Sequence, residues 1–439
     1  MAQLSEIAGY VNEKIYSDQI SLSQYVTTDS LLQNKCGRTM ANNLPPQRCS
    51  LTHYKEGDIL IANIRPYLKK IWFADCAGGA SADVLVFRAI NPNDAKFVYA
   101  VLMQDGFYDY AMKGAKGSKM PRGDKDQIMR YKIPTFSAFE KENIGKFIVD
   151  IESKMALNRQ INDNLEAMAK QLYDYWFVQF DFPNEEGKPY KSSGGKMVWN
   201  DKLKREIPEG WNVKSIFNEL SVQYGYPFST DQFTEEQTNV PVVRIRDILD
   251  NSISTYSHED TDDKYRLNEG DLLVGMDGNF HMNYWIDNAA YLNQRSVRLR
   301  ATALSTVSVV QARYDIAPYI KAKELRAKGS TVGHLSDKDL KELYVIVGTS
   351  NKLRDAFDSL LNRIIANRKE NLLLIKQRDE LLPLLMNGQV SVNYHLSMHF
   401  LRISLTIICQ STKKIAILHR LDSLFCVFVV YYIQKFLTL

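Results

Sequence analysis

The sequence predicts an α+β protein in which two similar globular α/β domains are separated by two long helices that form an antiparallel coiled coil. Two observations lead to this prediction. An apolar seam with alternating steps of four and three residues runs from 144 to 176, and 209 positions later it recurs from 353 to 385. The segments that precede the two seams share landmarks at an offset of 213. One unit of domain plus helix is therefore written twice, which predicts a pseudo-twofold internal repeat.

The length of the chain predicts two or three domains, and its composition is that of a globular protein. The chain has 439 residues, 45% of them hydrophobic and 24% charged, and its net charge is only +4, so the local distribution of charge must indicate any nucleic-acid partner. Its five cysteines are widely spread and form no C-x-x-C pair. We expect no membrane partner and a cytoplasmic location, because neither a signal peptide nor an apolar run of about 18 residues is present.

The first domain is expected at residues 1–136. Short apolar strands are predicted at 58–62 and 82–87, between glycines, and a helix at 97–110. The following stretch, 113–132, combines seven lysines and arginines with three glycines and is predicted to be an open, basic loop.

The first long helix is expected at 137–180. Ser137 and Glu140 form the pattern of a capping box at its start, and its end carries a dense aromatic cluster. Prolines and glycines then predict a linker at 181–210.

The second domain is expected at 211–347 and the second long helix at 348–388, ending near Asn387 and Gly388. Residues 57–61 correspond to 270–274, and 124–126 correspond to 337–339. The motif at 276–278 is interpreted as a turn after a strand. The tail, 389–439, is atypical, since its apolar, β-branched sequence does not continue the pattern.

Two asparagines interrupt each seam at equivalent positions: Asn158 and Asn162, Asn367 and Asn371. If the helices were antiparallel with full overlap, facing residue numbers would sum to about 529, so that Asn158 would meet Asn371 and Asn162 would meet Asn367. Such pairs would fix the register of the helices. The alternative is that these positions face a partner protein or solvent.

No catalytic motif is found in the sequence. It contains no P-loop, no H-E-x-x-H and no histidine or cysteine spacing for a metal, so we expect neither a catalytic residue nor a bound metal.

The joining regions resemble the specificity subunit of bacterial type I restriction–modification systems. The resemblance lies in residues 164–177 (NLEAMAKQLYDYWF), 180–183 (FDFP), 207–211 (IPEGW) and 381–388 (LLPLLMNG), and it covers about residues 1–396. It implies a non-catalytic reader of double-stranded DNA, in which each globular domain is a target-recognition domain for one half of a split sequence and the helices set the spacing.

The resemblance also implies partners. Two modification (methyltransferase) subunits would dock on the helices and central region, and restriction subunits would join the complex. The cofactors S-adenosylmethionine, ATP and Mg would be bound by these partners, and none would be bound directly by this chain. Our candidate docking residues are at the aromatic end of the first helix: Tyr173, Tyr175, Trp176 and Phe177.

Candidate DNA-binding residues follow from chemistry, because Lys and Arg neutralise phosphates and Arg, Asn and Gln read base edges. In the first domain they are Lys113, Lys116, Lys119, Arg122 and Lys125, with Arg65, Lys69 and Lys70 as second choice. In the second they are Asn293, Gln294, Arg295, Lys328, Ser330 and Thr331. Two readings stay open beside this one: solvated surface loops, and a coiled-coil scaffold with two ligand-binding modules and no DNA role.

Overall fold

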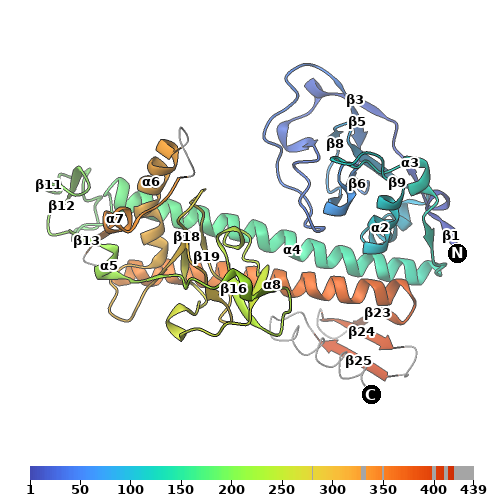
Figure 1. Cartoon of the computed structure of the whole chain (residues 1–439). Coiled ribbons are helices and arrows are strands. Elements are labelled where there is room, and N and C mark those ends of the chain that lie inside the picture. Colours follow the sequence, from blue (N-terminus) through green and yellow to red (C-terminus); the bar gives the residue numbers. More distant parts are fainter. Residues whose placement is uncertain (279, 328–332, 349–350, 398–401, 410–413, 420–439) are drawn as a thin grey trace. The chain divides into compact units, whose positions relative to one another are not determined.

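The computed structural model of the chain describes residues 1–278, 280–327, 333–348, 351–397, 402–409 and 414–419. These residues divide into two compact units. Unit 1 comprises residues 1–157 and 370–439, and unit 2 comprises residues 158–369. Each unit contains a globular part and one part of each of the two longest helices, α4 (Ala138–Tyr173) and α8 (Asn351–Met386), which Figure 1 shows in their sequence colours.

Two four-stranded sheets form the globular part of unit 1. The first has the order β2-β9-β6-β7 and is antiparallel throughout. Its strands are β2 (Ala8–Tyr10), β9 (Val84–Ala89), β6 (Ile59–Ala62) and β7 (Ile71–Phe73). The second sheet has the order β3-β5-β8-β4, made of β3 (Lys14–Tyr16), β5 (Ser50–Tyr54), β8 (Gly78–Ala80) and β4 (Tyr25–Val26). The two predicted strands are thus present as β6 and β9, and every residue of β6 is buried.

The predicted helix at 97–110 is wrong as a single element. The structure has two helices, α1 (Ala95–Leu102) and α2 (Asp105–Lys113), because the backbone becomes extended at Gln104. The predicted open loop at 113–132 is also too long. Lys113 ends α2, and α3 (Lys125–Met129) begins where the Asp124 carboxylate accepts hydrogen bonds from the N–H groups of Asp126 and Gln127. Strand β10 (Lys132–Ile133) then pairs with β1 (Ala2–Gln3).

Within unit 1 the long helices pack against each other. Ile144, Ile148 and Met155 of α4 share one buried cluster with Leu381 and Leu385 of α8. Since the first part of α4 meets the last part of α8, the helices are antiparallel in this unit. The predicted capping box is confirmed at the start of α4, where the Ser137 N–H donates to Glu140 and the Glu140 N–H donates to Ser137.

Unit 2 contains a sheet with the same strand order as the first sheet of unit 1, β14-β21-β18-β19. Its strands are β14 (Ser221–Tyr224), β21 (Ser296–Arg300), β18 (Leu272–Gly275) and β19 (Met282–Tyr284). The second sheet, β15-β17-β16-β20, consists of β15 (Phe233–Thr234), β17 (Thr255–Ser257), β16 (Val240–Val243) and β20 (Tyr291–Leu292). Two further strands, β13 (Asn212–Ser215) and β22 (Tyr344–Val347), form a two-stranded antiparallel sheet. The helices of this part are α5 (Ile216–Glu219), α6 (Val309–Ala327) and α7 (Asp337–Lys341).

A buried carboxylate explains why the Gly-Asp landmark occurs in both units. Asp58 directly precedes β6 and accepts two hydrogen bonds of 2.7 Å from the Arg88 guanidinium. In unit 2, Asp271 accepts two from Arg300, at 2.6 and 2.7 Å. Bidentate Arg–carboxylate pairs are geometrically specific, and removing the arginine would leave the carboxylate charge buried without this partner.

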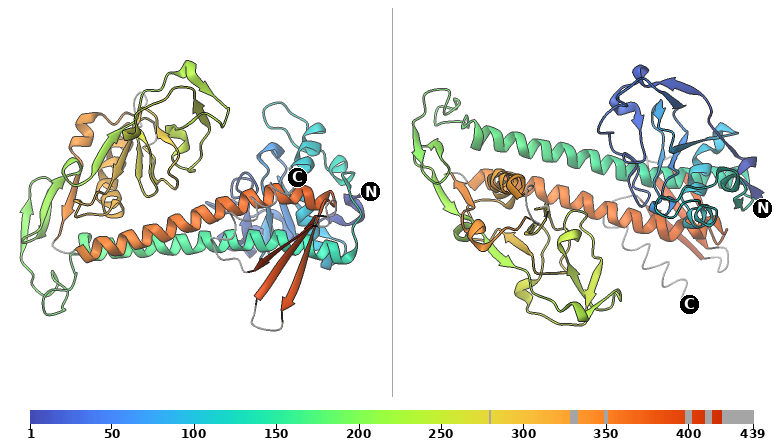
Figure 2. Two further views of the ribbon diagram at one scale, coloured as in Figure 1. Left: turned by 90° about the horizontal axis from the view of Figure 1, so that it is seen from below. Right: turned by 45° about the horizontal axis from the view of Figure 1, so that its top comes forward.

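In unit 2 the last part of α4 and the first part of α8 lie side by side (Figure 2), with Ala169 and Tyr173 in the same buried cluster as Leu353, Phe357 and Leu361. After Tyr173 the chain makes a π-helical turn, η6 (Asp174–Val178), so the regular helix ends earlier than predicted. Part of the predicted linker is a hairpin of β11 (Met197–Asn200) and β12 (Arg205–Pro208).

At the other end of the chain, α8 stops at Met386, as predicted, and Gly388 has a left-handed backbone with φ of +68°. Described parts of the tail form an antiparallel sheet in the order β23-β24-β25 within unit 1. Its strands are β23 (Val390–Ser397), β24 (Arg402–Cys409) and β25 (Lys414–His419). No helix in the described ranges combines the length and apolarity that crossing a bilayer requires.

Candidate nucleic-acid interface

The basic segment of unit 1 is a narrow hairpin attached to the loop that follows β6. Lys116 and Arg122 exchange both backbone hydrogen bonds at 2.9 Å, which closes a short loop at 117–121. The Arg65 N–H donates to the Pro121 carbonyl at 2.7 Å, and the Gly123 N–H donates to Asn63. First-choice and second-choice candidates are therefore neighbours, although about 50 residues separate them in the sequence. We call residues 63–65 and 116–123 together the unit 1 junction.

Two of the cations in this hairpin have acidic partners. The Arg122 guanidinium donates to both carboxylate oxygens of Asp83, at 3.2 and 3.3 Å. Lys116 lies 3.3 Å from Asp124, but its side chain is 84% exposed, so this pair is weak. Backbone hydrogen bonds and then Lys116 lower the pKa of Asp124. The carboxylate is therefore charged at neutral pH.

Lys119 is at the tip of the hairpin and Lys113 is at the end of α2. Within the described ranges, no ion pair or side-chain hydrogen bond engages either ammonium group. Lys125 is held more firmly, since its ammonium lies 5.9 Å from the centre of the Tyr10 ring and its carbonyl accepts from the Tyr10 hydroxyl. Exposed, unpaired cations can neutralise phosphates at low cost, so Lys113 and Lys119 are the better candidates.

The second-choice residues have three different environments. Arg65 is exposed and has a left-handed backbone with φ of +53°. Lys69 forms an ion pair of 2.9 Å with Asp105. Lys70 donates to the Thr28 carbonyl at 2.6 Å, and burial lowers its pKa. Of these three residues, Arg65 therefore remains the candidate for contact with DNA. Lys69 and Lys70 stabilise the loop through their partners.

Unit 2 builds an equivalent junction after β18. The Gly278 N–H donates to Gly333, as Arg65 donates to Pro121, and the Leu335 N–H donates to Met276, as Gly123 donates to Asn63. We call residues 276–278 and 333–335 the unit 2 junction. The prediction of a turn at 276–278 is confirmed, because β18 ends at Gly275 and Gly278 has φ of +70°.

The candidate base readers of unit 2 lie beside this junction. Arg295 has a left-handed backbone with φ of +68° and donates to the Asp277 carboxylate at 2.8 Å, while the other oxygen of Asp277 lies 2.6 Å from His334 Nδ1. Gln294 is exposed. Asn293 is buried, and in the described structure its side-chain oxygen has no hydrogen-bond partner. Gln294 is therefore an accessible candidate, Arg295 is exposed but already paired with Asp277, and Asn293 is not accessible. Lys328, Ser330 and Thr331 lie outside the described residues.

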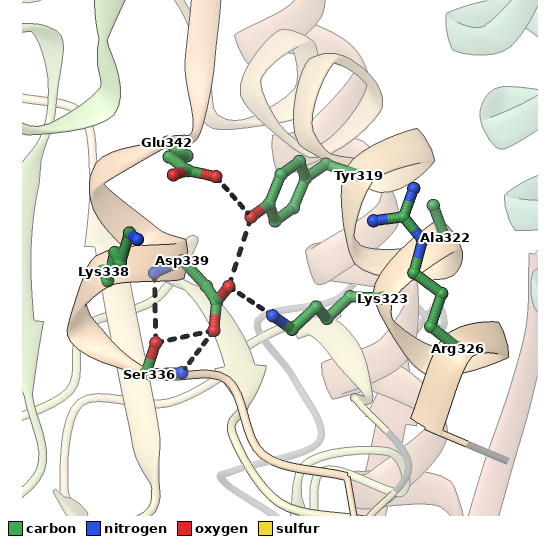
Figure 3. Close-up of a pocket in the computed structure, with 8 residues that line it drawn as sticks. All are labelled: Tyr319, Ala322, Lys323, Arg326, Ser336, Lys338, Asp339 and Glu342. Atoms are coloured by element: carbon green, nitrogen blue, oxygen red, sulfur yellow. Dashed lines mark hydrogen bonds and ion pairs between the residues drawn. The ribbon is translucent and has the colours of Figure 1, made fainter. Parts of the chain in front are cut away.

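Basic residues of α6 line a pocket of about 390 Å³ next to α7 (Figure 3). Two of these basic residues, Lys323 and Arg326, belong to the last two turns of the helix. Burial alone would raise the pKa of Asp339, but hydrogen bonds from Lys323 and Ser336 hold it at about 2. Lys323 is thus neutralised within the protein, and Arg326 and Lys338 remain as the exposed cations of this pocket.

One pair of seam asparagines is in direct contact within unit 2. Asn367 Nδ2 donates to Asn162 Oδ1 at 2.8 Å, and Asn162 Nδ2 donates to the Ile364 carbonyl at 3.2 Å. Asn371 in unit 1 donates to the Met155 carbonyl at 3.3 Å. Asn158 is buried. These contacts satisfy polar groups at the contact between the two helices, and the role of the asparagines in register remains a prediction.

The candidate docking residues are largely internal. Tyr173 and Phe177 are buried and stack on each other with ring centres 5.3 Å apart, and Phe177 packs against Trp211. Trp176 stacks on Phe182 at 5.1 Å and is partly buried, as is Tyr175. Burial leaves Tyr173 and Phe177 little surface for a partner. They pack the end of α4 against the rest of unit 2. The spacing of the aromatic residues in the sequence does not show that these side chains are buried.

Comparisons with known proteins agree with this arrangement. Residues 208–373 match the family model described as the type I restriction modification DNA specificity domain. The specificity subunit of the type I restriction enzyme MjaIX from Methanocaldococcus jannaschii is 25% identical over 369 residues, which are 79% of this chain and 80% of that protein. A shorter match, 29% identical over 143 residues, covers 31% of this chain and 28% of the EcoBI specificity subunit from Escherichia coli.

Among solved structures, the type I restriction–modification S subunit from M. genitalium has a similar fold. Its TM-score is 0.50 at 13% identity, and the match covers 88% of this chain and 95% of that chain. Residues 208–373 thus match the type I specificity domain, and over 79% of its length the chain is similar to a specificity subunit of a type I restriction enzyme.

Proposed function

We propose that this chain is the DNA-reading subunit of a type I restriction–modification complex and that it recognises a bipartite sequence. Residues 1–136 would read one half-site and residues 211–347 the other. The chain would supply recognition, and the catalytic groups would come from its partners. Two modification subunits would bring S-adenosylmethionine, and restriction subunits would bring ATP and Mg.

The observation that carries this proposal is the equivalence of the two junctions. Each is formed by the loop after a central, fully buried strand and by the segment that precedes a short capped helix. Each presents exposed cationic or amide side chains: Arg65 and Lys119 in unit 1, Gln294 and Arg295 beside the junction in unit 2. The scaffold is the same and the exposed residues differ, as expected if each domain reads different bases.

The long helices would act as a coiled-coil spacer and would set the distance between the half-sites. Two observations support this part. Both helices have 36 residues, and each unit contains a part of both. Because α4 and α8 are shared in this way, a change in their length would act on both domains. Partner subunits would dock on helix surfaces turned away from the seam and on the central hairpin, where Trp199 is exposed.

The proposal is tested by sequencing the methylome of a host that expresses this chain with its modification subunits. We expect methylated adenine in one bipartite motif. Exchange of residues 1–136 for those of a related subunit should change one half of the motif and leave the other half unchanged.

Two results would contradict the proposal. One is the absence of a motif although the complex assembles. The other is a complex that shows no salt-dependent DNA binding, which would instead favour a scaffold with two ligand-binding modules.

A further inference from the structure

A partly buried ion-pair network in unit 1 lies between the long helices and the candidate DNA-binding junction. Its centre is Arg378, whose side chain is 0% exposed and occupies the one seam position that breaks the repeat, since the equivalent residue is Ala169. We call the following six residues the Arg378 network: Arg378, Glu152, Asp379, Lys35, Asp105 and Lys69.

The network connects three helices and two loop segments. Arg378 of α8 donates to Glu152 of α4 at 2.8 Å and to Asp379 at 2.9 Å. Asp379 also accepts from Lys35 at 3.0 Å. Lys35 donates to Asp105 of α2, likewise at 3.0 Å, and Asp105 pairs with Lys69. Three cations thus face three carboxylates. The Lys35 side chain is only 6% exposed, and a lysine is rarely buried so deeply without such partners.

Backbone contacts continue from this network to the junction. Arg378 also donates to the Lys35 carbonyl at 3.1 Å. The N–H groups of Asn34 and Lys35 donate to the carbonyls of Leu68 and Lys69. Asn34, Lys35, Arg65 and Lys69 all have positive φ, a conformation that ordinary residues keep only where their surroundings impose it. The 3-10 turn η4 (Pro66–Leu68) therefore lies between the network and Arg65, whose N–H holds the tip of the basic hairpin.

Unit 2 ties its domain to the helices with a different residue. Arg368 of α8 donates to Glu166 of α4 at 3.0 Å and to the Asn283 side chain of β19 at 2.9 Å. Asn283 in turn donates to the carbonyls of Ile248 and Leu249. Each unit thus has an arginine of α8 that contacts both α4 and the globular domain, although Arg378 lies on the seam and Arg368 lies beside it.

We propose that the Arg378 network is a positioning device for the first half-site. It holds the loop at 63–69, and with it the basic hairpin, in one orientation on the helix pair, so that base discrimination at this half-site depends on residues that never touch DNA. Arg368 has the corresponding role for the second half-site. This inference rests on the proposed function of the chain.

The test compares Arg378→Met and Arg368→Met in the complete complex with its modification subunits. For Arg378→Met we expect about a tenfold loss of discrimination against wrong bases in one half of the motif, the half that changes when residues 1–136 are exchanged. Arg368→Met should relax the other half. Methylome sequencing measures both in one experiment, and Arg378→Lys should restore part of the discrimination because it keeps one positive charge beside Glu152.

A merely structural role for Arg378 predicts a lower melting temperature with both half-sites read as before. That result, or an equal loss at both half-sites, would overturn the inference. If Arg378→Met does not assemble, Lys35→Met and Lys69→Met decide the question, since they remove outer contacts and leave the helix pair intact. If the wild-type protein itself yields no bipartite motif, the proposed function is refuted. This outcome differs from failure of the inference, in which the wild type yields the motif and the variants read both half-sites as before.

Discussion

The cationic residues of the hairpin in the unit 1 junction lie close together in the sequence but differ in whether an acidic side chain pairs with them. Arg122 is held by Asp83, whereas Lys119, three residues earlier, extends from the hairpin tip without an ion pair in the described structure. An arginine that is already paired helps to shape the loop. A lysine that is exposed and unpaired can displace counterions from a phosphate.

Lys119→Ala should therefore weaken DNA binding by the complex without altering base preference. We expect the slope of log K against log salt concentration to fall in magnitude by about one. Titrations at several salt concentrations measure this slope. Lys96→Ala, at an exposed lysine of α1 away from the junction, serves as the matched control and should leave the slope unchanged. An unchanged slope for Lys119→Ala would remove this residue from the interface.

Asp315 is a second residue whose surroundings determine its chemistry. Burial raises its pKa to about 7, although Tyr173, Ile346 and Gln311 all donate hydrogen bonds to the carboxylate. The folded chain thus binds this proton more tightly than the unfolded chain does. Its contribution to stability is complete below about pH 4 and is lost as the pH rises through about 7.

Asp315→Asn should reduce this pH dependence, because the amide stays neutral and Tyr173 can accept a hydrogen bond from it. At pH 8 we expect the variant to be more stable than the wild type by roughly 1–2 kcal/mol, a discounted value because the side chain keeps some contact with solvent. Denaturant titrations between pH 5 and pH 8 report the free energy of unfolding. Parallel curves for the two proteins would show that Asp315 does not titrate in this range.

At the scale of elements, the long helices combine apolar packing with a few buried amides. In unit 2 the Asn162 and Asn367 side chains are hydrogen-bonded to each other, whereas Leu361 and Ile365 of α8 belong to a buried apolar cluster. Buried amides lower stability but disfavour other alignments of the two helices. The predicted antiparallel register thus has one directly observed pair.

A double-mutant cycle measures that pair. Asn162→Leu and Asn367→Leu should each cost about 1–3 kcal/mol, because each removes the hydrogen bond between the two amides and leaves the remaining amide facing a leucine, whereas the double variant should be close to the wild type or more stable. Thermal or denaturant unfolding gives the four free energies. Additive losses would mean that the two amides act independently. As a control, Leu372→Ala at an exposed position of α8 should cost little.

At the scale of the whole molecule, the proposed spacing function depends on equal helix lengths. Seven residues inserted after Leu157 in α4 and seven after Asn371 in α8 would preserve the heptad phase at positions that face each other in the predicted register. Seven residues of helix rise about 10 Å, or about three base pairs of DNA. We expect the spacer of the methylated motif to lengthen by about three base pairs with both half-sites unchanged.

Methylome sequencing again provides the measurement. Paired insertions of five residues are the control, because they rotate the apolar seam out of phase and should abolish assembly rather than lengthen the spacer. A heptad variant that assembles and keeps the original spacing would show that the helices do not set the distance.

By itself, the sequence determined the features that depend on local pattern. The Ser137–Glu140 box and the helix end before Gly388 depend on neighbours within one or two helical turns, and the structure has both. The repeated Gly-Asp landmark was equally visible, and the same sheet order in both units gives it a structural meaning. Local pattern failed where a break was short, as between α1 and α2, since a two-residue interruption carries little signal.

Contacts between distant parts of the chain determine which charged side chains form ion pairs within the protein and which are exposed without such a partner in the described structure. Lys35 pairs with Asp379, 344 positions away, and Arg122 pairs with Asp83, 39 positions away. Such partners leave no periodic trace in the sequence, so a basic run looks the same whether its charges are neutralised or exposed. The burial of Tyr173 and Phe177, which removes them from a docking surface, was settled in the same way. A folded core forms from residues that are distant in the chain, and burial in that core sets the chemistry of each side chain.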